Sequence, residues 1–145
     1  MEQDLFRKER KQSNKRLFLS LPIPPSVNSI YTLRKQLTSK AQKFIRVARA
    51  SVLASIEDQH WHMPPRTEWL YVDCVFYMPD RKIRDSHNCL KILLDVLQDS
   101  VFVNDYFVLP RIQSVEYDKE NPRVEVLITH QTKLARDKGL KMTHV

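Results

Sequence analysis

The segment from Ser86 to Gln98, SHNCLKILLDVLQ, restricts the fold of this 145-residue chain more than any other. On a helical wheel its apolar residues cover an arc of roughly 200°, so it predicts a helix that is mostly buried. A narrow polar stripe remains on that helix, and polar groups beside a buried surface need water, ions or another molecule as partners. The stripe contains His87, Asn88, Lys91, Asp95, Gln98 and Asp99.

The rest of the chain predicts a sheet against which this helix packs. Apolar residues recur at helical spacing from Ser39 to Gln59, and Pro64 and Pro65 end that pattern. Runs rich in β-branched and aromatic residues predict strands, and the last two strands form a hairpin across DKENP. The predicted strands are Leu17–Leu21, Trp69–Met78, Arg111–Tyr117 and Arg123–Thr129. The order β-α-β-α-β-β indicates a mixed sheet carrying two helices, in the α+β or α/β class.

Length and composition indicate one domain with two polar ends. A chain of 145 residues with 42% apolar content builds a core without disulfides or a structural metal. We expect the domain to span residues 17–130, between a basic N-terminal arm (1–16) and a basic C-terminal tail (131–145). Both ends are able to reach toward DNA, and the alternative is that they are solvated tails with no specific role.

Several classes of protein are excluded by what the chain lacks. Its only glycine is Gly139, so the glycine-rich loops that bind ATP or NAD are missing and no nucleotide cofactor is expected. Cys74 and Cys89 lie in apolar runs without CxxC spacing, which indicates reduced core thiols. The N-terminus has no secretory signal and no run reaches the length of a membrane span. We therefore expect a cytoplasmic protein without a membrane partner.

The charge of the chain favours an anionic partner. Its formal net charge is +7, and lysines and arginines that neutralise phosphates gain free energy by releasing counterions. Lys40, Lys43 and Arg46 follow one another at intervals of three in the first predicted helix, and no acid occurs from Leu19 to Ile56. This segment is a candidate for contacts with DNA phosphates, although a solvated helix face accounts for the same pattern.

Basic and acidic residues are segregated around the second predicted helix. Arg81, Lys82 and Arg84 crowd the loop before Asp85, whereas the span from Ile92 to Pro110 has no lysine or arginine and contains three aspartates. Basic loops hold phosphates, and carboxylates hold a divalent cation against the phosphate that is cleaved. The alternative is that Asp85 only caps the helix by accepting the free N–H groups of its first turn.

Three motifs of the chain resemble the RusA family of Holliday junction resolvases. They are LPIPPSVN, MPDRKIRDSHNCLKILLDVLQ and VFVNDYFV, which match the family's PxPPSxN opening, its RDxDNxxKxxxDxL helix and the DD pair that follows. The similarity covers about residues 17 to 130. It implies a RusA-like fold and a homodimer that binds four-way junction DNA. It also implies that the dimer nicks the junction with Mg²⁺ in DNA recombination and repair.

The resemblance also implies the residues of the site. Asp85, Lys91 and Asp105 match the family's catalytic positions, and the metal ligands would be Asp85, His87 and Asp105. Asn28 matches the asparagine of the opening motif. The expected DNA-binding residues are therefore Asn28, Lys40, Lys43, Arg46, Arg81, Lys82 and Arg84.

The chain departs from the family pattern at two positions. His87 occupies the place of the second aspartate of the helix motif, and Asn104 that of the first member of the DD pair. Exchanging a carboxylate for an imidazole removes a negative charge and an oxygen donor, so Mg²⁺ should bind less well and Mn²⁺ relatively better.

This departure leaves more than one function open. The chain is either a metal-dependent endonuclease or a branched-DNA-binding protein that cuts weakly or not at all. Retention of Asp85, Lys91 and Asp105 favours the enzyme. A third possibility is a dimerisation or regulatory domain whose basic charge is incidental.

Overall fold

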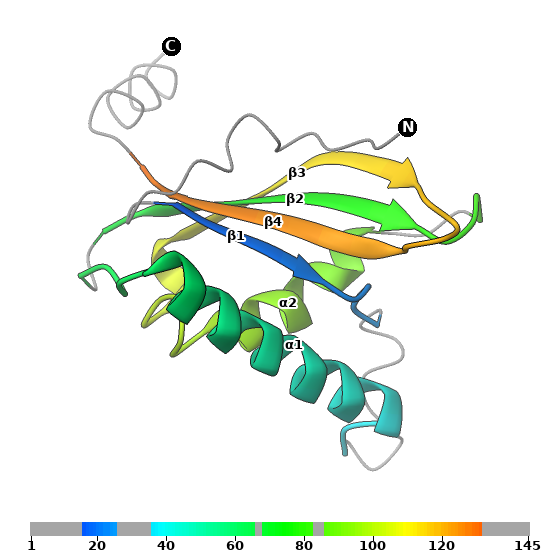
Figure 1. The fold of residues 1–145 in the computed structure, drawn as a ribbon, viewed down its shortest axis with the longest axis horizontal. Helices are drawn as coiled ribbons and strands as arrows, with labels where there is room; N and C mark the ends of the chain where they lie inside the picture. Colours follow the sequence, from blue (N-terminus) through cyan, green and yellow to red (C-terminus); the bar gives the residue numbers. More distant parts are fainter. Residues whose placement is uncertain (1–15, 26–35, 66–67, 83–85, 132–145) are drawn as a thin grey trace.

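The computed structural model describes residues 16–25, 36–65, 68–82 and 86–131, and these form a four-stranded sheet with two helices beneath one of its faces (Figure 1). The strands are β1 (Arg16–Leu21), β2 (Leu70–Met78), β3 (Val108–Tyr117) and β4 (Arg123–His130). The helices are α1 (Ser39–Gln59) and α2 (Leu90–Leu97), and two short 3-10 turns are η3 (Ser86–Cys89) and η4 (Asp105–Phe107). The expected α+β class and the order of strands and helices are confirmed.

The predicted hairpin of the last two strands is wrong. The sheet order is β1-β4-β2-β3, so β2 lies between β3 and β4 and pairs with the first in parallel and the second antiparallel. The reason is the burial of β2, since eight of its nine residues are buried and a strand of this kind occupies the middle of a sheet. The chain leaving β3 crosses the end of β2, where the Asp118 N–H donates to the Met78 carbonyl at 2.8 Å.

Helix α1 has the bounds that its periodicity predicts. Thr38 begins it by accepting the Ala41 N–H on its hydroxyl, and His60 ends it in the left-handed region at φ 56°. The Gln59 side chain then donates to the Phe18 carbonyl at 2.7 Å and accepts the Phe18 N–H at 2.8 Å. This side chain therefore occupies the hydrogen-bonding groups of one residue at the outer side of the edge strand β1, which protects that edge from pairing with another strand.

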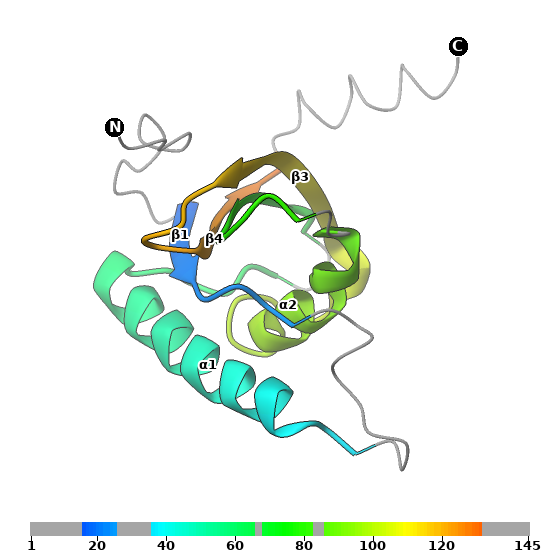
Figure 2. The same cartoon turned by 90° about the vertical axis from the view of Figure 1, so that its right-hand side faces the viewer.

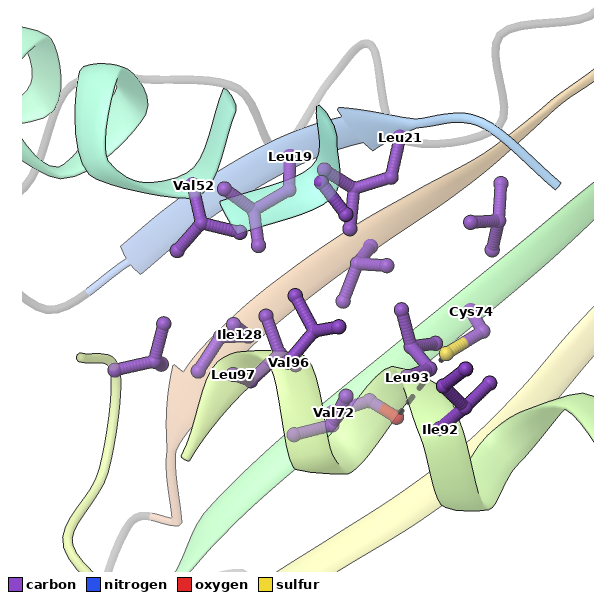
Figure 3. Packing of buried hydrophobic residues seen from close by; sticks show 14 of the residues in the cluster. Leu19, Leu21, Val52, Val72, Cys74, Ile92, Leu93, Val96, Leu97 and Ile128 are labelled. Atoms are coloured by element: carbon purple, nitrogen blue, oxygen red, sulfur yellow. Dashed lines mark hydrogen bonds between the residues drawn. The ribbon is translucent and has the colours of Figure 1, made fainter. Parts of the chain in front are cut away.

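Helix α2 is shorter than predicted, because the expected helix begins with the 3-10 turn η3 and becomes α-helical at Leu90. Its buried residues are Ile92, Leu93, Val96 and Leu97. Figure 3 shows them packed against the sheet residues Val72, Cys74 and Ile128, with Leu19 and Leu21 of β1 and Val52 of α1 in the same cluster. Burying one such Leu or Ile side chain contributes about 1.5–3 kcal/mol, so the apolar arc of α2 holds this helix firmly under the sheet.

Both cysteines are free and buried, as the sequence predicts. In the described part of the chain no helix is long and apolar enough to cross a membrane.

Candidate active site

The first group of predicted site residues lies on η3 and α2. Cys89 fixes this turn, because its thiol contacts the Pro24 carbonyl at 3.5 Å in the core. His87, Lys91 and Asp95 follow at intervals of four and are all exposed. Residues four apart share one face of a helix, so the predicted polar stripe faces solvent while the opposite face is buried. Asp85 and Arg84 lie outside the described residues.

The second group lies at η4, directly before β3. The Tyr106 N–H donates to the Asn104 side-chain oxygen at 2.9 Å, which closes the turn that begins at Asp105. Asn104 lines a small pocket together with Glu68 and Leu70, so η4 lies at the end of the sheet where β2 begins. The Asp105 side chain is outside the described part of the structure, and its backbone begins η4.

The two groups lie at opposite ends of α2 (Figure 1). Strand β2 runs parallel to β3, and the first residue of β2, Leu70, pairs with the first residue of β3, Val108. Asp105 therefore lies at the end of the sheet where β2 begins, whereas η3 lies at the other end, where β2 ends. These two ends are separated by the length of β2, and nine residues of β-strand span roughly 26 Å. Among the described histidine, cysteine and acidic residues, no three are grouped closely enough to hold a metal ion.

The basic loop after β2 lies at the same end of the sheet as the last residues of β3. Arg81 and Lys82 are exposed, and the Arg81 guanidinium lies 4.9 Å from the centre of the Tyr117 ring. Together with Met78 and Val115 they line a shallow hollow of about 470 Å³. Sequence reasoning missed Val115 and Tyr117, because alternating apolar residues in a strand predict burial in the core. No signal in the sequence indicates that the described part of the chain leaves these two side chains exposed.

The predicted phosphate contacts on α1 are solvent-exposed. Lys40, Lys43 and Arg46 all lie on the outer surface of the helix, whereas Ala41, Phe44, Ala48 and Val52 are buried. In Figure 2, α1 is the outermost element of the helical layer. Exposure makes these cations accessible to DNA, and Asn28, the remaining predicted contact, lies outside the described residues.

The predicted ligands fit a divalent cation by their donor chemistry. Two carboxylates, from Asp85 and Asp105, supply the hard oxygen donors that Mg²⁺ and Mn²⁺ prefer, and an imidazole such as that of His87 is a better ligand for Mn²⁺ than for Mg²⁺. His87 is exposed, so its ring is accessible to an ion in solution.

Comparison with models of protein families shows the family to which this chain belongs. Residues 22–129 match the model of the family described as Endodeoxyribonuclease RusA. The chain belongs to the RusA endodeoxyribonuclease family. The match includes α1, the basic loop, η3, α2 and η4, which are the elements that carry the predicted site residues. Membership of the RusA family implies a nuclease that resolves Holliday junctions and acts in recombination. A comparison with curated proteins found no match.

Proposed function

We propose that this protein is a Holliday junction resolvase, which hydrolyses phosphodiester bonds of four-way DNA junctions with Mg²⁺, or with Mn²⁺ in its place. It would act in DNA recombination and repair. The observation that carries this proposal is the RusA family match, which covers both groups of candidate site residues.

The residues divide into ligands and phosphate contacts. Asp85, His87 and Asp105 would hold the ion, which when bound polarises a phosphoryl oxygen and lowers the pKa of a bound water. Lys91 lies one helical turn after His87, and its ammonium would neutralise charge that develops on the phosphate in the transition state. The exposed cations of the basic loop and of α1, with Arg84 and Asn28, would hold the flanking DNA backbone.

A homodimer accounts for the separation of the two groups. In one chain the elements that carry His87 and Asp105 lie at opposite ends of α2. We propose that a two-fold axis brings the η3 end of one copy beside the η4 end of the other, so that residues of both subunits would hold each ion. A four-way junction has matching symmetry, and such a dimer would cut it at two equivalent positions.

Cleavage of a labelled synthetic four-way junction tests the proposal, with Mg²⁺ and Mn²⁺ in parallel and Asp85→Asn as the control. Symmetric paired nicks that disappear in the variant are the expected result. Mixing Asp85→Asn with Asp105→Asn then tests the shared site. If two subunits form each site, a mixed dimer regains one intact site and nicks one strand. Two inactive proteins that stay inactive when mixed would contradict the shared site while leaving the nuclease proposal to the first assay.

The alternative function is a branched-DNA-binding protein that cuts poorly or not at all. The observation that favours it is the loss of two carboxylates relative to the family pattern, at His87 and Asn104. Tight binding to junctions but not to linear duplex, without nicks under either metal, would establish this alternative.

A further inference from the structure

The hollow at the ends of β2 and β3 exposes apolar side chains that no described element covers. Val115 is 52% exposed and Tyr117 is 39% exposed. In the sheet register Val115 pairs with Phe76 and Tyr117 with Met78, and both of these partners belong to the core beneath the sheet. The two exposed side chains therefore lie on the helix side of an edge strand, where no described element packs over them.

The loop after β2 adds two cations to this apolar floor. Arg81 lies over the Tyr117 ring at 4.9 Å, and the neighbouring Lys82 is exposed. The two carboxylates of the hollow have donors of their own. Asp80 accepts the Lys82 N–H at 3.0 Å, and Glu116 accepts the Ser114 hydroxyl at 2.6 Å.

An aromatic ring beside cations is the combination with which proteins bind unpaired nucleotides. The base stacks on the ring and the cations hold the backbone. The hollow, at about 470 Å³, is within the size range of small-ligand sites. The hollow is also near the proposed cleavage site in the sequence, because Arg81 and Lys82 precede the candidate ligand Asp85 by only four and three residues.

We propose that this hollow binds one nucleotide that leaves the base stack next to the cut. Its base lies against Tyr117 and Val115, and its phosphate lies between Arg81 and Lys82. The proposal rests on the proposed function, which supplies the junction, and it adds a contact that distinguishes a branch point from linear duplex. Linear duplex offers no unstacked base for the ring.

The test uses junctions that carry 2-aminopurine, a fluorescent base, at single positions beside the crossover. They are bound to protein with the Asp85→Asn substitution so that no strand is cut. Tyr117→Ala should weaken junction binding about 5- to 150-fold, the range for loss of one stacked base, and should change the emission at one position. Tyr117→Phe should behave like the parent, and binding to linear duplex should be unchanged in both variants.

Leu53→Ala is the matched control, because this apolar side chain is 57% exposed on α1, which does not line the hollow. Equal junction affinity and emission for Tyr117→Ala and its parent would overturn the proposal. An equal loss in Leu53→Ala would do the same. Dissociation of a dimer by Tyr117→Ala, measured by light scattering without DNA, would assign the hollow to a second copy instead.

Cleavage by the unmodified protein is measured separately from these binding assays. A wild-type protein that makes no nicks but shows the Tyr117-dependent binding and emission would contradict the resolvase activity and keep the nucleotide site. Paired nicks together with unchanged binding by Tyr117→Ala would contradict only the nucleotide site.

Discussion

The indole N–H of Trp61 donates to the carbonyl of Val101 at 3.1 Å, and both residues are buried. This bond joins the segment after α1 to the loop that leads into η4, where Asp105 begins the turn. Trp61→Phe keeps an aromatic ring but leaves the Val101 carbonyl without this donor, so we expect a loss of about 1–3 kcal/mol in the free energy of unfolding. Chemical denaturation measures that loss. A variant as stable as wild type would show that this hydrogen bond does not hold the loop.

Strand β3 is tied to β2 by a charged pair on the sheet face opposite the helices. Arg111 donates to Asp73 through two bonds of 2.6 and 2.8 Å, and its guanidinium lies 3.7 Å from the centre of the Tyr71 ring. Asp73 is buried but Arg111 is partly exposed, so Arg111→Met should cost about 1–2 kcal/mol after solvent screening.

The matched control for this pair is Gln113→Ala, which removes a single bond of 3.0 Å to the same carboxylate and should cost less. Replacing both charges, as Asp73→Val with Arg111→Met, should cost less than the sum of the single variants, because no unpaired charge then stays buried. Denaturation of wild type, Asp73→Val, Arg111→Met and the double variant checks this. Strict additivity of the two losses would contradict the coupling.

Restoring the family aspartate should change the metal preference. His87→Asp adds a carboxylate at an exposed position, so we expect tighter Mg²⁺ binding and a higher ratio of Mg²⁺- to Mn²⁺-supported nicking. Calorimetric titration with each metal gives the affinities independently of activity. Equal Mg²⁺ affinity in wild type and His87→Ala would show that His87 is not a ligand.

The exposed cations of α1 should contribute to DNA binding without regard to sequence. Changing Lys40, Lys43 and Arg46 together to Gln should weaken binding to all DNA and reduce the slope of log K against log salt by about 0.9 for each phosphate that the helix no longer neutralises. Anisotropy titrations at several salt concentrations measure the slope. Lys119→Gln, an exposed lysine in the turn after β3, serves as the control. An unchanged slope in the triple variant would show that this face of α1 contacts solvent and not DNA.

Cys74 should be inert in the folded protein. Burial, and secondarily the negative charge of Asp73, raise the pKa of its thiol from 9.0 to about 12. At pH 9 the native thiol is therefore neutral, and iodoacetamide should label it only after unfolding, which mass spectrometry of the labelled peptide detects.

The same raised pKa makes stability depend on alkaline pH. Below pH 9.0 the thiol is protonated in both states and its contribution is complete. As the pH rises from 9.0 toward about 12 the unfolded thiol ionises first and stability is lost. This loss should be smaller in Cys74→Ala, and equal alkaline losses in both proteins would contradict it.

The sequence by itself determined the elements of this protein and its family. Helix α1 could be predicted from about Ser39 to Gln59, because its apolar spacing and the prolines after it are local features. The buried face of α2 and its exposed polar stripe were predicted for the same reason, since side chains three and four apart share a helix face. The family motifs are also local patterns, and the match over residues 22–129 confirmed them.

Only the tertiary structure decided which strands pair and which candidate residues lie together. The strands β3 and β4 are adjacent in sequence and joined by a turn, yet β2 lies between them because a strand buried on both faces needs partners on both sides. The parallel pairing of β2 with β3 places Asp105 where β2 begins, whereas η3 follows the end of β2, and the same pairing leaves Val115 and Tyr117 exposed on an edge strand. Such relations depend on hydrogen bonds and burial between segments distant in the chain, which the periodicity of any one segment does not contain.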